Sequence, residues 1–306
     1  MARLSISSFL AGAASAAIMV AVPATAAVRP VQADLHPEDY DGTAPVLTVN
    51  AVTFVVGQSI DATVKRDDCY TDAYHWAVPM VMSWSASDVD SGLKSYDVFS
   101  DDPDSRQLRS DTQETSLAWS GRTDFNDCGG GGYPTRFYVV AKDNRGNSAM
   151  SALSGSNIID VWQENAAVNP SMHGERYGHL AMTKSSGWST SNCKCYDAGT
   201  TLYSTQAGNT ITYSVTTNAP GQTFAVVMEK NSNRGQASIS VSGGTSQTVE
   251  TYASPAVHRA IVWQRTLGVG TTTVKIVNLG TAGRPRIDVD ALMLTSPAGG
   301  QPPPVP

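Results

Sequence analysis

The chain has 306 residues, of which 41% are hydrophobic and 16% are charged. This composition is typical of a folded globular protein and excludes disorder over the whole length. The formal net charge is −6 and no cluster of basic residues stands out, so we expect no nucleic-acid partner.

The first 26 residues have the features of a secretory signal peptide. Arg3 supplies the positive charge, an apolar run covers Phe9–Val22, and the small residues Ala24-Thr25-Ala26 precede the expected cleavage site. A membrane anchor is the competing interpretation, but the run is shorter than the roughly 20 residues that span a bilayer. We therefore expect a secreted protein, extracellular or associated with the cell wall, with no membrane span in the mature chain.

The chain contains four cysteines, which are Cys69, Cys128, Cys193 and Cys195. In an oxidising compartment this number indicates two disulfides. For Cys193 and Cys195 a local disulfide is the favoured interpretation. The alternatives are exchange with the other two cysteines, or a zinc or copper site with His173 or His179.

The charge divides the chain near residues 151–157. Residues 27–155 carry 19 acidic and 10 basic side chains, whereas residues 156–306 carry 8 and 10. We predict a leader loop at 27–43, a first domain at 44–155, a second domain at 156–296 and a Pro-rich tail at 297–306.

The first domain is predicted to be all-β. Runs rich in Val, Thr, Tyr and Phe alternate with clusters of Gly, Asp, Asn and Ser, and no segment keeps a helical period over three turns. Such a series of short strands is typical of an immunoglobulin or fibronectin type III β-sandwich. The expected strands are Pro45–Asn50, Ser59–Val64, Met80–Ser85, Lys94–Phe99, Thr115–Trp119, Arg136–Lys142 and Ser148–Leu153.

Two motifs of this domain resemble the immunoglobulin-like modules of secreted bacterial proteins. Residues 83–98 resemble the second and third strands of such modules, and residues 138–147 resemble their final hairpin. The resemblance implies a core position for Trp84 and a turn at residues 143–147. It also implies that the connections carrying Cys69 and Cys128 emerge at the same end, where a disulfide between them is feasible.

Acidic residues suggest a calcium site in the first domain. Asp88 and Asp90, with Asp143 nearby in a fold of this type, offer the carboxylate oxygens that calcium prefers. The competing interpretation is that these side chains cap turns.

The second domain is also predicted to consist of strands. One or two strands before residue 209 would bring the number to eight or nine, which favours a jelly-roll sandwich. The remaining strands are expected at Thr210–Thr217, Gln222–Glu229, Ala237–Val241, Thr248–Tyr252, His258–Gln264, Thr272–Leu279 and Arg286–Thr295.

The order of motifs in this domain resembles the galactose-binding-like jelly rolls of secreted actinobacterial proteins, whose relatives include carbohydrate-binding modules. The landmarks are Gly187–Ser191, Ala198–Ser204, Ala207–Tyr213, Lys230–Ala237, His258–Trp263 and Gly283–Ala291. The chain departs from the pattern at Val241-Ser242-Gly243, where relatives often have Val-Asp-Gly. Asp290 resembles a calcium ligand of some such modules, with Glu164 as its candidate partner, although those relatives usually have two early acids.

Sugar binding requires aromatic faces for stacking and a few polar groups that fix the hydroxyls. The candidates, all from the second domain, are Trp188, Tyr196 and Tyr203 with the polar partners Asn192 and Arg234, and the alternatives are Tyr252 and Trp263. We place Trp188 and Tyr196 in loops. A core position is the competing interpretation, which we favour for Trp263 and which stays open for Trp188.

No catalytic motif is visible in the sequence. It has no Gly-x-Ser-x-Gly elbow, and His173 and His179 lack the His-Glu-x-x-His spacing. The sequence therefore predicts a secreted, non-catalytic protein that binds a polysaccharide or a cell-surface glycan. The alternatives are a structural or adhesive wall-associated protein with protein partners, and a hydrolase with a dispersed active site.

Overall fold

The computed structural model describes residues 41–65, 74–100, 106–124, 137–151, 157–163, 180–217 and 219–297, which belong to one compact unit. The predicted signal peptide, most of the leader and the Pro-rich tail lie outside these ranges, as do Cys69, Cys128, Glu164, His173 and His179. Within these ranges the structure is all-β, as predicted, with twenty strands and one short 3-10 turn. None of the described segments is a helix long and apolar enough to span a bilayer.

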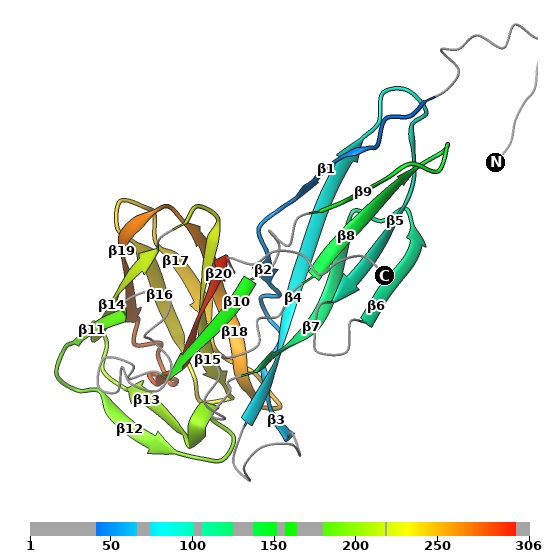
Figure 1. The fold of residues 1–306 in the computed structure, drawn as a ribbon. Coiled ribbons are helices and arrows are strands. Elements are labelled where there is room, and N and C mark those ends of the chain that lie inside the picture. Colours follow the sequence, from blue (N-terminus) through cyan, green and yellow to red (C-terminus); the bar gives the residue numbers. More distant parts are fainter. Residues whose placement is uncertain are drawn as a thin grey trace, which may run out of the picture. The chain divides into compact units, whose positions relative to one another are not determined.

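The first nine strands form two antiparallel sheets (Figure 1). The long strand β4 pairs with β1, β2, β3 and β7, and the second sheet has the order β6-β5-β8-β9. All seven predicted strands are present, and the structure adds the short β2 and the polar β6. The bounds are β1 (Val46–Val49), β2 (Thr53–Phe54), β3 (Asp61–Lys65), β4 (Tyr74–Ser87), β5 (Leu93–Ser100), β6 (Arg106–Thr112), β7 (Ser116–Asp124), β8 (Phe137–Asp143) and β9 (Ser148–Met150).

The core between these two sheets contains Trp84, as predicted. Its side chain is 2% exposed and meets the ring of Tyr96 edge-on, with 5.9 Å between the centroids. Residues 143–147 form the expected turn between β8 and β9, in which Gly146 has a φ of 96° that favours glycine.

The remaining eleven strands form a second sandwich of two antiparallel sheets, a jelly roll with more strands than the eight or nine expected. A six-stranded sheet has the order β12-β13-β20-β15-β18 with β10 also on β20, and a five-stranded sheet has the order β11-β14-β19-β16-β17. The bounds are β10 (Asn157–Gln163), β11 (Leu180–Lys184), β12 (Ser189–Asn192), β13 (Thr200–Ser204), β14 (Thr210–Thr217), β15 (Gln222–Lys230), β16 (Gln236–Val241), β17 (Gln247–Glu250), β18 (Val257–Leu267), β19 (Gly270–Asn278) and β20 (Ile287–Pro297).

The outer face of the six-stranded sheet is covered by the segment around β2. Val52, Phe54 and Ile60 share a buried apolar cluster with residues of β15, β18 and β20. The side-chain amide of Gln264 accepts a hydrogen bond from Phe54 N–H and donates one to Phe54 C=O, both at 2.7 Å. This part of the outer face of the six-stranded sheet is therefore closed to a ligand.

Candidate functional site

Three loops of the second sandwich come together at one end: residues 231–235, 251–256 and 279–286. Backbone hydrogen bonds join them, from Asn231 N–H to Thr251 C=O at 3.0 Å and from Gly235 N–H to Arg286 C=O at 2.9 Å. A Cβ atom on Gly235 would lie 2.1 Å from the carbonyl oxygen of Arg284, so this close approach requires glycine. Side chains from distant parts of the sequence therefore meet here.

Two tyrosines and three arginines dominate this region, and we call Tyr203, Arg234, Tyr252, Arg284 and Arg286 the tyrosine–arginine cluster. The guanidinium carbon of Arg286 lies 4.0 Å from the ring centroid of Tyr203, and that of Arg284 lies 4.7 Å from the ring centroid of Tyr252. Such cation–π contacts fix the orientation of both rings. Arg284 also donates to the carbonyl oxygen of Arg234 at 2.9 Å, which links the two halves of the cluster.

A buried carboxylate holds two of these arginines in place. Asp288 is 0% exposed and accepts hydrogen bonds from Arg286 Nε at 3.0 and 3.1 Å, and from Arg234 Nη2 at 3.3 Å. Burial alone lowers the pKa of Arg286, but its hydrogen bond and charge interaction with Asp288 outweigh burial and raise this pKa. Asp288 therefore favours the charged form of Arg286 and forms hydrogen bonds with both guanidinium groups.

Strand β20 is irregular where it pairs with β15. The pairing of β15 with β20 has a register shift between Val227 and Met228, and both Asp288 and Asp290 on β20 are fully buried. An irregularity of this kind adds a residue to one strand and changes which face its side chains take. The sequence pattern alone does not reveal it.

Tyr196 lies beside the cluster on the connection between β12 and β13, and Asn192 is the last residue of β12. Tyr196 lies in a loop as predicted but is only 7% exposed, and its pKa is raised by burial and by the charge of Asp288. Asn192 is exposed at the end of β12. Tyr196 therefore supports the buried side of the cluster, whereas Asn192 is open to solvent.

The position of Trp188 corrects a sequence-based expectation. Trp188 precedes β12 in a loop, but its indole is 8% exposed, packs in the core between the two sheets and donates a hydrogen bond to Thr210 C=O at 3.0 Å. Trp263 is buried as we expected, at 4% exposure. Neither indole offers an open face to a sugar in this structure.

The loop after β12 contains the local disulfide favoured from the sequence, between Cys193 and Cys195. The carbonyl oxygen of Cys195 accepts a hydrogen bond from Arg259 Nη1 at 3.1 Å. The buried carboxylate of Asp290 accepts one from Asp197 N–H at 3.0 Å. Asp290 thus anchors this loop, and its calcium role with Glu164 stays a prediction, because Glu164 lies outside the described residues.

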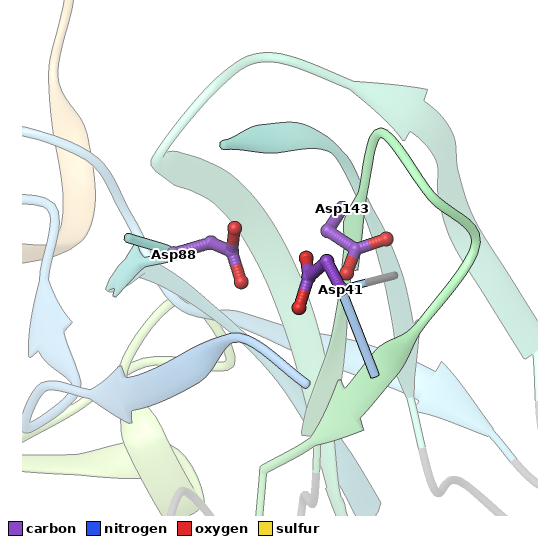
Figure 2. Close-up of side chains that lie close together, drawn as sticks. All are labelled: Asp41, Asp88 and Asp143. Atoms are coloured by element: carbon purple, nitrogen blue, oxygen red, sulfur yellow. The ribbon is translucent and has the colours of Figure 1, made fainter. Parts of the chain in front are cut away.

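The acidic site of the first sandwich contains two of the three residues that we predicted. Asp88 and Asp143 do come together, but the third member is Asp41, and the three carboxylates offer oxygens within 4.8 Å of one another (Figure 2). Asp90 is exposed and does not belong to this group. Asp41 could not be found from the sequence, because it lies 47 residues before Asp88 and outside any motif.

The carboxylates of Asp88 and Asp143 also cap turns. Asp88 accepts hydrogen bonds from Ser91 N–H and Gly92 N–H at 2.8 and 2.7 Å. Burial raises the pKa of Asp143, but hydrogen bonds from the Asn147 side chain and from nearby backbone N–H groups outweigh burial and lower this pKa. Turn capping and a cation site are therefore compatible at these residues.

Comparisons with known proteins gave only remote similarities. No protein-family model matches the chain, and no curated protein matches it. A family 35 carbohydrate binding module from Clostridium thermocellum is 18% identical, covers 45% of this chain and 98% of its own length, and has a TM-score of 0.34. The CBM36-1 domain of a xylanase from the hindgut metagenome of Trinervitermes trinervoides is 15% identical over 47% of this chain and 99% of that domain, with a TM-score of 0.29.

A catalytic protein is also among the similar structures. An exo-beta-1,3-galactanase from Phanerochaete chrysosporium is 12% identical over 77% of this chain, with a TM-score of 0.30, and the match spans 57% of that enzyme. The function of this chain is therefore inferred from its own residues.

Proposed function

We propose that the chain is a secreted, non-catalytic carbohydrate-binding protein, and that the tyrosine–arginine cluster contacts the sugar. The observation that carries the proposal is the exposed ring of Tyr252. Its residue is 46% exposed, and among the aromatic residues whose burial is described it alone is exposed. Aromatic faces of this kind stack on the apolar C–H surface of a sugar ring.

Hydrogen-bonding groups surround this ring. The side chains of Arg284 and Glu250 are 28% and 42% exposed and form an ion pair at 3.2 Å. Ser232 and Asn233 are exposed on the adjacent loop. An aromatic face with a few fixed polar groups is the usual composition of a sugar site. In this proposal Tyr203, Asn192 and Arg286 extend the surface, while Arg234 and Tyr196 hold its buried side.

The environment of two carboxylates in this region, Asp288 and Glu250, supports binding without catalysis. Asp288 is paired with two arginines. Burial raises the pKa of Glu250, but hydrogen bonds from Tyr252 N–H and Arg284 outweigh burial and lower this pKa. A glycoside hydrolase needs one carboxylic acid with a raised pKa as its proton donor. The pKa of Glu250 is shifted in the opposite direction, which favours its ionised form.

Export is part of the same proposal. The apolar N-terminal segment supports it, and so does the Cys193–Cys195 disulfide, because disulfides persist mainly in oxidising compartments. A polysaccharide or a surface glycan outside the cell is then the accessible ligand.

The proposal is tested by screening the chain against a glycan array and a panel of insoluble polysaccharides. We expect saturable binding to at least one glycan and no release of reducing ends from it. Release of reducing ends that depends on Glu250 would favour a hydrolase instead. Absence of binding to every glycan, with capture of a protein from cell envelopes, would favour the structural or adhesive alternative.

A further inference from the structure

Three segments of the first sandwich bring carboxylates to one place. Asp41 precedes β1, Asp88 lies in the connection between β4 and β5, and Asp143 ends β8. Each offers one oxygen, and these oxygens lie within 4.8 Å of one another; Figure 2 shows the three side chains gathered at this point. The cluster belongs to the first sandwich and is independent of the tyrosine–arginine cluster.

One carboxylate oxygen of Asp41 has no hydrogen-bond partner among the described residues. The Oδ1 atom of Asp41 accepts a hydrogen bond from Thr43 N–H at 2.8 Å, whereas its Oδ2 atom is buried and has no hydrogen-bond partner. A buried carboxylate oxygen without a donor is unfavourable, and such orphans in native proteins are commonly explained by an ion or a water molecule.

The hydrogen bonds that the other two carboxylates accept come from uncharged groups. Asp143 is 0% exposed and accepts from Arg145 N–H at 2.9 Å and from Asn147 N–H and Nδ2 at 2.8 and 2.7 Å. The donors to Asp88 are the N–H and hydroxyl of Ser91 and the N–H of Gly92. None of these donors carries a positive charge that would pair with a carboxylate.

We propose that a calcium ion binds between Asp41, Asp88 and Asp143. Calcium is bound by six to eight oxygens at about 2.3–2.6 Å, so two oxygens on one ion lie at most about 4.6–5.2 Å apart. The three carboxylate oxygens lie within 4.8 Å of one another, which agrees with this limit. The ion gives Asp41 Oδ2 the partner that the protein does not supply. It also fastens the segment before β1 to two turns, alongside the hydrogen bond from Asn147 Nδ2 to Asp41 C=O at 2.9 Å.

The test is isothermal titration of the chelator-treated full chain with calcium chloride. We expect saturable binding with a Kd of about 10⁻⁴ to 10⁻³ M, the range of extracellular calcium modules. Asp88→Asn and Asp41→Asn each remove one charged ligand and are expected to weaken binding by about tenfold or more, because ligand charge tunes calcium affinity. Asparagine keeps the side-chain oxygen that caps each turn, so both variants retain the local fold.

Asp90→Asn is the matched control, since it removes the same charge from the exposed residue two positions from Asp88. It is expected to bind calcium as the unmodified chain does. An equal loss in Asp90→Asn would show a diffuse charge effect and overturn the proposal. So would a lack of saturable binding at about 10 mM, well above the expected range. If Asp88→Asn fails to fold, by circular dichroism, Asp41→Asn decides the outcome.

Discussion

Replacing Asp288 by Asn tests whether the tyrosine–arginine cluster depends on its buried charge. The substitution keeps the size of the side chain but removes the negative charge that faces Arg234 and Arg286. The side chain of Asp288 is 0% exposed, and those of the two arginines are 5% and 23% exposed. Two guanidinium groups would then stay desolvated without a counter-charge.

The size of the effect follows from this burial. Removing one partner of a buried ion pair costs about 3–5 kcal/mol, and we expect the lower end because Arg286 reaches solvent. For a protein of this size each kcal/mol lowers Tm by about 2–4 °C, so the expected loss is roughly 6–12 °C. The Arg284–Glu250 pair is much more exposed, and Glu250→Gln is expected to cost less than about 1 kcal/mol.

Calorimetry of the two variants and the unmodified chain gives the comparison. A Tm of Asp288→Asn that is no lower than that of Glu250→Gln would refute the assignment of Asp288 as the buried counter-charge. A Tm of Asp288→Glu between those of Asp288→Asn and the unmodified chain would support it.

Three further predictions concern other contacts. Gln264→Ala leaves the Phe54 N–H and C=O without their partner and should cost about 1–3 kcal/mol in urea unfolding; an unchanged midpoint would contradict this. Gly235→Ala should distort the loops and weaken glycan binding, because its Cβ has no room, and unaltered affinity would contradict that clash. Hydrogen bonds from Lys142 and, to a smaller extent, from Ser95 lower the pKa of Asp111 from 3.8. The ionised Asp111 therefore stabilises the fold above this pH, and this contribution is lost as the pH falls below it. Lys142→Met should raise the pKa of Asp111 in an NMR titration. The free energy of unfolding should then fall less as the pH is lowered, and an unshifted pKa would contradict this.

Strands with regular patterns could be predicted well from the sequence. Residues 137–143 alternate strictly between buried and partly buried positions, and residues 210–217 do the same. The polar strands β6 and β12 were missed, because Arg106–Thr112 has Leu108 as its one apolar residue and Ser189–Asn192 has none. Edge positions of this kind are determined by neighbouring strands rather than by their own residues.

The candidate sites were predicted less well, for physical reasons. The sequence left the exposure of Trp188 open, and the fold supplies an acceptor for its indole at Thr210 and buries it. Arg234 was found in the sequence as a polar candidate, but its partner Asp288 lies 54 residues away and is recognisable only from the pairing of the strands. Tyr252 was an alternative in the sequence and became the central residue because its exposure is visible only in the fold.

The proposed function is tested most directly by the affinity of Tyr252 variants for a glycan that the screen identifies. Tyr252→Ala removes the stacking face and is expected to lower affinity by about tenfold or more, because aromatic contacts contribute about 0.5–1.5 kcal/mol beyond the area they bury. Tyr252→Phe keeps the ring and should bind nearly as the unmodified chain does. Val269→Ala, 64% exposed in the turn at the opposite end of β18, is the control and should have no effect. Unchanged affinity in Tyr252→Ala would contradict the account.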